Sequence, residues 1–262
     1  MQNFEFVRPT SVADAVAALK GDEAQPMSGG QTLMPTMKAR LAAPEILVSL
    51  TAIDEMKGVR KDGDQIWIGG GTTHATVARE TAESFPALSS LAGRIGDPSV
   101  RSRGTIGGSI ANNDPSACYP AGALGSGATI VTDRREIAAD DFFQGMFMTA
   151  LDEGEIVTAV KFPVPQKAIY QKFIQPASRF PLTAVFVAHF GDTVRVAVTG
   201  ASSDGVFRWT EAEEALQGNF SADAVSGLSV SADTMISDLH GSGAYRAQLT
   251  KVMTQRAVAA LA

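Results

Sequence analysis

The stretch that decides the fold runs from Thr105 to Asn113 and reads Thr-Ile-Gly-Gly-Ser-Ile-Ala-Asn-Asn. Its two adjacent glycines permit positive φ and carry no Cβ, so that a ligand can approach the main chain closely. Successive N–H groups in such a turn can converge on an anion, and the hydroxyls of Thr105 and Ser109 would add donors. The stretch therefore predicts an anion-binding loop, with a plain tight turn between strands as the alternative.

A second Gly-Gly pair lies earlier in the chain, within Ser28-Gly29-Gly30-Gln31-Thr32, and it too is flanked by hydroxyl and amide side chains. A charge-assisted bond from N–H to phosphate contributes about 1.5–3 kcal/mol net. Two such loops could therefore hold the two phosphates of one dinucleotide without a lysine. Arg101 and Arg103 precede the second loop and could assist in binding, but we expect them to be solvated or packed against an acidic neighbour.

Composition limits the classes of function. The chain has 262 residues, 45% of them hydrophobic, and a net charge of −6. This length suits one large domain or two modest ones, and the acidic balance argues against binding to nucleic acid. No apolar run is long enough to cross a membrane. The first residues, Met1 to Phe6, lack the basic and apolar regions of a signal peptide. We therefore expect a cytoplasmic protein.

Cysteine and histidine usage argues against a metal centre in this chain. Cys118 is the single cysteine, so no internal disulfide and no cysteine-ligated iron–sulfur cluster can form. His74, His189 and His240 are scattered and none belongs to an H-E-x-x-H pattern. Any redox chemistry must then be carried by an organic cofactor or by a partner chain.

Common catalytic and nucleotide-binding motifs are also missing. The sequence contains no G-x-G-x-x-G, no G-x-x-x-x-G-K-[ST] and no G-x-S-x-G. It therefore gives no support for a Rossmann dinucleotide site, a P-loop or a nucleophile elbow. His189 lies in an apolar run and is expected to be structural. Asp140 and Asp141 are expected to form a turn or a helix cap. We assign no catalytic residue.

Hydrophobic periodicity divides the chain into two parts. Residues 4–50 read as a small β-α-β-like lobe, and a second lobe carries strands near 65–69, 128–131 and 155–162 with helices from about 75, at 86–95 and at 120–125. Pro163 and Pro165 mark the best candidate boundary, since proline disfavours both helix and central strand. Beyond them we expect three antiparallel strands, at 170–174, 182–190 and 194–199, backed by helices at 210–216 and 244–260.

Three segments carry a resemblance to a known family. They are Ser28 to Pro35, Ile95 to Asn112 and the C-terminal Ser237-Asp-Leu-His-Gly-Ser-Gly-Ala-Tyr-Arg246. Together they resemble the FAD-binding medium subunit of molybdenum hydroxylases, of the aerobic carbon monoxide dehydrogenase medium-subunit type, related to the flavin domain of xanthine dehydrogenase. The likeness runs from about Phe4 to Ala260.

This resemblance implies an α+β fold. It consists of a two-lobed FAD-binding domain of the vanillyl-alcohol-oxidase/PCMH type, followed by a smaller C-terminal α+β domain with a three-stranded antiparallel sheet and helices. The expected domains are residues 1–165, with lobes of about 1–55 and 56–165, and residues 166–262.

The resemblance also assigns contacts to FAD. The two glycine segments match those that wrap its diphosphate, with Ser28 where alanine is usual and Ser109 where asparagine is usual. The residues implied are Ser28, Gly29, Gly30, Gln31, Thr32 and Leu33 in the first segment, and Thr105, Ile106, Gly107, Gly108, Ser109 and Asn112 in the second.

Four further residues follow from the same resemblance. Asp114 fits the family's Asp-Pro, and Cys118 stands where many members carry an aspartate near the flavin ribityl chain. Lys172 matches a lysine that enters the C-terminal domain. Phe180 falls where relatives place a residue over the flavin ring.

In such complexes a large molybdopterin subunit hydroxylates the substrate, and a small subunit with two [2Fe–2S] clusters passes electrons to this FAD and on to an external acceptor. The resemblance thus implies an oxidoreductase component of a heterotrimer. The alternatives are a self-sufficient FAD oxidoreductase of the same fold and a non-catalytic nucleotide-binding module.

Overall fold

A small parallel sheet begins the chain in the computed structural model, which describes all 262 residues. The strands β1 (Glu5–Val7), β3 (Ile46–Ser49) and β2 (Ala24–Met27) lie in that order. Parallel neighbours need crossovers, and α1 (Val12–Ala18) and α2 (Leu33–Lys38) lie within them. Ser11 caps α1, and its Oγ accepts a bond from the N–H of Asp14 at 3.1 Å.

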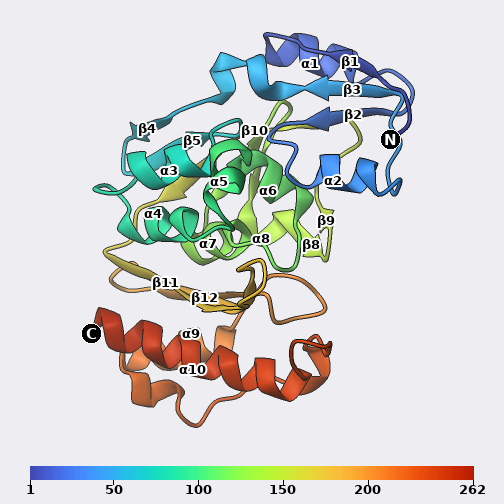
Figure 1. Ribbon diagram of the computed structural model, residues 1–262. Helices are drawn as coiled ribbons and strands as arrows, with labels where there is room; N and C mark the ends of the chain where they lie inside the picture. Colours follow the sequence, from blue (N-terminus) through green and yellow to red (C-terminus); the bar gives the residue numbers. More distant parts are fainter.

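A five-stranded antiparallel sheet forms the middle of the molecule (Figure 1). Its order is β4 (Val59–Asp62), β5 (Gln65–Gly69), β10 (Val157–Pro163), β6 (Thr129–Thr132) and β7 (Glu136–Ala138). Five helices come between β5 and β6 in the chain: α3 (His74–Glu80), α4 (Pro86–Gly93), α5 (Pro98–Arg103), α6 (Ile106–Asn112) and α7 (Tyr119–Ser126). Apolar residues of α4, α6 and α7 share the main core with β5, β10 and β6.

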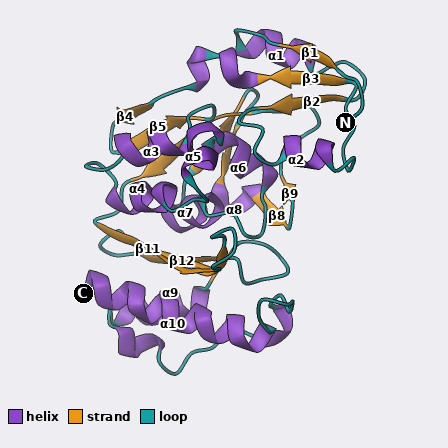
Figure 2. Ribbon diagram, in the orientation of Figure 1, coloured by secondary structure: helices purple, strands orange, loops and turns teal.

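The C-terminal part is a second antiparallel sheet backed by helices, drawn at the bottom of Figure 2. Its strands are β11 (Lys167–Ile174), β12 (Pro181–His189), β13 (Val194–Thr199) and β14 (Phe207–Arg208), and its helices are α9 (Thr210–Gly218) and α10 (Gly243–Leu261). The predicted three strands are present, but the sheet has a fourth at its edge. No pattern in the sequence marks β14, because two residues are too few to show alternation.

The shorter elements are few. They are α8 (Ala139–Phe142), the hairpin of β8 (Phe143–Gly145) and β9 (Met148–Thr149), and four 3-10 turns at Leu50–Ala52, Asp54–Met56, Ala222–Val225 and Ala232–Thr234. Asp140 lies in the first turn of α8, and its carboxylate accepts bonds from Arg195 at 2.7 Å and Arg208 at 3.1 Å. None of the helices is long and apolar enough to cross a membrane.

The main core crosses the boundary expected at residues 165/166. Strand β12 is buried along almost its whole length because α7 covers one face of its sheet and α10 the other. Phe186 of β12 packs edge-on against Phe85 at 6.1 Å between ring centroids, and it fills the space beside Gly122 and Gly125 of α7. We therefore propose that residues 165/166 separate the five-stranded sheet from the C-terminal sheet in sequence, whereas the main core is common to both sheets.

Candidate functional site: a cavity between two glycine segments

The first glycine segment presents a row of unused donors. It leaves β2 at Ser28 and enters α2 at Leu33, and none of the six backbone N–H groups of residues 28–33 donates a hydrogen bond within the chain. Gly30 has a φ of 68°, which is the left-handed conformation that glycine adopts without strain. Consecutive free N–H groups of this kind form an anion-binding concavity.

The second glycine segment is the first turn of α6. The expectation of a loop with positive φ was wrong there, because Gly107 and Gly108 are helical and Thr105 is the N-cap. Most of its amides already have partners: Ile106 N–H donates to Thr72 O at 3.1 Å, and Gly107 N–H donates to Gly70 O at 2.9 Å. Glycine is needed at 107 for close approach, since a Cβ would lie 2.7 Å from Gly70 O.

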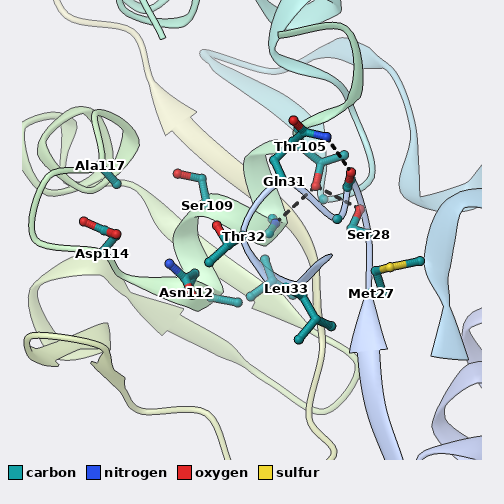
Figure 3. A pocket seen from close by; sticks show the side chains of 18 of the residues that line it. Met27, Ser28, Gln31, Thr32, Leu33, Thr105, Ser109, Asn112, Asp114 and Ala117 are labelled. Atoms are coloured by element: carbon teal, nitrogen blue, oxygen red, sulfur yellow. Dashed lines mark hydrogen bonds between the residues drawn. The ribbon is translucent and has the colours of Figure 1, made fainter. Parts of the chain in front are cut away.

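The two glycine segments touch each other, as Figure 3 shows. The Thr105 hydroxyl donates to Ser28 Oγ at 2.8 Å, across 77 residues of sequence. Gly29 lies directly on the main chain before α6, and a Cβ there would come within 2.2 Å of Arg103 O. Sequence reasoning paired these segments correctly, although it assigned the wrong backbone conformation to one of them.

A cavity of about 800 Å³ opens against both segments. This volume lies within the range of small-molecule and cofactor sites. Every residue assigned to FAD from the resemblance lines the cavity except Ile106, whose side chain is fully buried in the main core. The hydroxyl of Ser109 and the amide of Asn112 lie near the cavity in Figure 3 and make no hydrogen bond within the chain.

A thiol and a lysine lie side by side in the cavity lining. Lys172 Nζ donates to Arg94 O at 2.8 Å and lies 3.6 Å from Cys118 Sγ. Burial lowers the pKa of Lys172, and it raises the pKa of the neighbouring Tyr170 well above the ordinary value. Cys118 is 4% exposed, so its thiol is buried beside the lysine.

Two buried residues near the cavity were not singled out from the sequence. His74 lines it beneath Gly104, and its Nδ1 has no hydrogen-bond partner. Burial, with a smaller effect of the Arg101 charge, lowers the pKa of His74 to about 4. Glu155 also lines the cavity, and hydrogen bonds from Arg135 hold its pKa at about 2. No sequence motif marks either residue, because each depends on contacts between distant segments.

The arginines before α6 do not take part in the cavity. Neither Arg101 nor Arg103 lines it, and Arg101 Nη1 donates to Ile95 O at 3.0 Å and Gly96 O at 3.2 Å. The expectation that Arg101 would be solvated or paired with an acid was therefore wrong. An anion bound here would be held by backbone and hydroxyl donors.

The fold and this cavity define a class of flavoprotein. The chain belongs to the family described as the FAD binding domain in molybdopterin dehydrogenase, whose model matches residues 2–165. Within that class it is an FAD-binding medium subunit of the molybdenum hydroxylases, an oxidoreductase component with FAD as its cofactor.

Relatives in sequence cover nearly the whole chain. The carbon monoxide dehydrogenase medium chain of Afipia carboxidovorans is 34% identical over 98% of this chain and 96% of its own. The nicotine 6-hydroxylase medium subunit of Paenarthrobacter nicotinovorans is 32% identical over 97% of this chain and 95% of its own. These two relatives are named for chemically unrelated substrates, so the shared subunit does not itself indicate a substrate.

Solved structures agree in fold. A chain of carbon monoxide dehydrogenase from Hydrogenophaga pseudoflava superposes with a TM-score of 0.89 at 33% identity, covering 99% of this chain and 97% of that one. A chain of quinoline 2-oxidoreductase from Pseudomonas putida 86 superposes with a TM-score of 0.88 at 25% identity, covering 99% and 97%.

Proposed function

We propose that this chain holds FAD across the cavity and relays electrons from partner [2Fe–2S] clusters to an external acceptor. The observation that carries the proposal is the row of six unused N–H groups at residues 28–33, which line a cavity sized for a cofactor. Such a row suits a diphosphate, because each N–H can donate to a charged oxygen. The part of the cavity lined by Cys118, Lys172 and Phe180 would receive the isoalloxazine.

The chain's own residues position the cofactor. Gly29 lets the first segment lie on the residues before α6. Its free N–H groups would donate to the diphosphate. Ser109 and Asn112 offer unpaired polar side chains along the cavity. Lys172 also lines the cavity, and its ammonium group would favour negative charge on a reduced ring. Bound FAD would supply the redox chemistry, since it accepts and returns electrons.

Electrons must then arrive from another chain. One cysteine cannot ligate an iron–sulfur cluster, and the relatives are named medium chains or medium subunits. We propose a large molybdopterin subunit and a small [2Fe–2S] subunit as the partners in one complex.

Two measurements on the native complex test this function. The complex should be yellow, should release flavin on denaturation, and should contain iron, sulfide and molybdenum in addition to flavin. Flavin without metals would support a self-sufficient FAD enzyme instead. A colourless protein that FAD cannot reconstitute would refute the proposal and favour a nucleotide-binding module.

A further inference from the structure

A loop of the C-terminal sheet carries Phe180 to the cavity. It runs from Gln175 to Phe180 between β11 and β12, and Gln175 N–H donates to Phe180 O at 3.0 Å. Ser178 and Arg179 both have left-handed backbone, with φ of 63° and 60°. Non-glycine residues adopt that conformation at a cost, and they keep it only where surrounding contacts impose it. Something must therefore hold this loop in place.

The contact that holds it comes from a distant turn. The His240 ring packs edge-on against Phe180, with 5.5 Å between ring centroids and an interplanar angle of 69°. His240 Nδ1 is also hydrogen-bonded to the side-chain amide of Gln175, at the other end of the loop. His240 does not line the cavity itself. It touches both ends of the loop from outside the cavity.

A buried arginine fixes the turn that carries His240. Asp238 accepts the N–H of His240 at 2.9 Å and a bond from Arg246 Nη2 at 2.8 Å. Arg246 is 2% exposed, and its Nη1 donates to Leu182 O and to Gly200 O, both at 2.7 Å. Leu182 lies two residues after Phe180. The Arg246 guanidinium thus holds in place both the turn that carries His240 and the start of β12, which follows Phe180.

We propose that His240 is a positioning residue for the flavin, acting through Phe180. The proposal rests on the proposed function, in which Phe180 contacts the isoalloxazine. Edge-to-face packing fixes the Phe180 ring, and the bond to Gln175 fixes the imidazole that makes this contact. The segment Ser237 to Arg246 would thus serve the cofactor without touching it.

The test compares FAD binding to wild type and variants in the reconstituted full chain. His240→Ala should raise the FAD Kd about threefold to tenfold, since an aromatic pair contributes that much beyond simple burial. His240→Phe keeps a ring and should recover most of the affinity. His189→Ala is the matched control, because His189 makes the same kind of edge contact with Phe220, at 4.8 Å, away from the cavity. It should bind FAD as wild type does.

A double-mutant cycle separates positioning from general stability. If His240 acts through Phe180, then His240→Ala should change the Kd less than about twofold in a Phe180→Ala background, because interacting residues are non-additive. If His240→Ala raises the FAD Kd as much in the Phe180→Ala background as it does in wild type, the proposal is refuted. Wild-type protein that fails to bind FAD would instead overturn the proposed function, and this inference with it.

A flavin-free measurement completes the test. Arg179 is exposed within the loop, so trypsin cleavage at the Arg179–Phe180 bond reports how often the loop opens. His240→Ala should accelerate that cleavage in apoprotein, and His189→Ala should not. Equal rates in all three proteins, with normal FAD binding by wild type, would remove His240 from this role while leaving the proposed function intact.

Discussion

Replacing Gly29 by alanine should separate the two glycine segments. A Cβ at residue 29 would lie 2.2 Å from Arg103 O and 2.7 Å from Gly104 Cα. Both are main-chain atoms, so neither can rotate away. Restoring an ordinary carbon-to-oxygen contact requires the segments to move apart by about 1 Å. That movement breaks the bond between Thr105 and Ser28, which is 2.8 Å long.

The expected loss is large for FAD and modest for the fold. Overpacking of this kind costs about 1–3 kcal/mol of folding free energy, so the apoprotein should remain folded. Displaced N–H groups would lose about two charge-assisted bonds to the diphosphate, or about 3–6 kcal/mol. This corresponds to FAD affinity about 10²- to 10⁴-fold weaker. Flavin content after purification and titration of apoprotein with FAD would measure it.

Two glycine-to-alanine changes provide controls. A Cβ at Gly108 would meet the Thr105 hydroxyl at 3.0 Å and nothing else closer than 3.9 Å. At most one neutral hydrogen bond would be lost, so Gly108→Ala should weaken FAD binding by less than about tenfold. Gly218 ends α9, and a Cβ added there would have no atom within 4 Å, so Gly218→Ala should leave binding unchanged. A folded Gly29→Ala protein that binds FAD within threefold of wild type would refute the close-approach argument.

Three further outcomes follow from the structure. In denaturant unfolding, Thr105→Val and Ser28→Ala should show a coupling energy of about 1 kcal/mol, and purely additive losses would mean that their hydrogen bond contributes nothing. The pKa of His74 is about 4 in the folded chain against an ordinary value of 6.5, so the unfolded state binds more protons between these two pH values. The free energy of unfolding should therefore fall by about 3 kcal/mol as the pH drops from 6.5 to 4. His74→Gln should lack this part of the dependence of stability on pH. Phe186→Ala should cost about 3–5 kcal/mol and lower the stability of both sheets in one calorimetric transition, whereas two separated transitions would contradict a shared core.

How far the sequence could predict this structure depends on where each signal lies. Strand β12 could be predicted from its continuous apolar run, and the caps Ser11 and Thr73 lie next to the helices they begin. The paired glycine segments could be recognised, but their different conformations could not. The close contact that requires glycine at 107 is made with Gly70, which belongs to a turn well before it. His74, Glu155 and Arg246 likewise gain their roles from partners that only the folded chain brings near.

The face of α7 that carries Gly122 and Gly125 limits where the chain can be cut into separate fragments. The family's model ends at residue 165, yet all eight residues of α7 are buried, and Phe186 from beyond that point rests on Gly122 and Gly125. A fragment cut at residue 165 would present this face to water. It could not serve as a portable flavin module in a fusion protein, and a homologue that shed its C-terminal sheet would need another chain to cover the same groove.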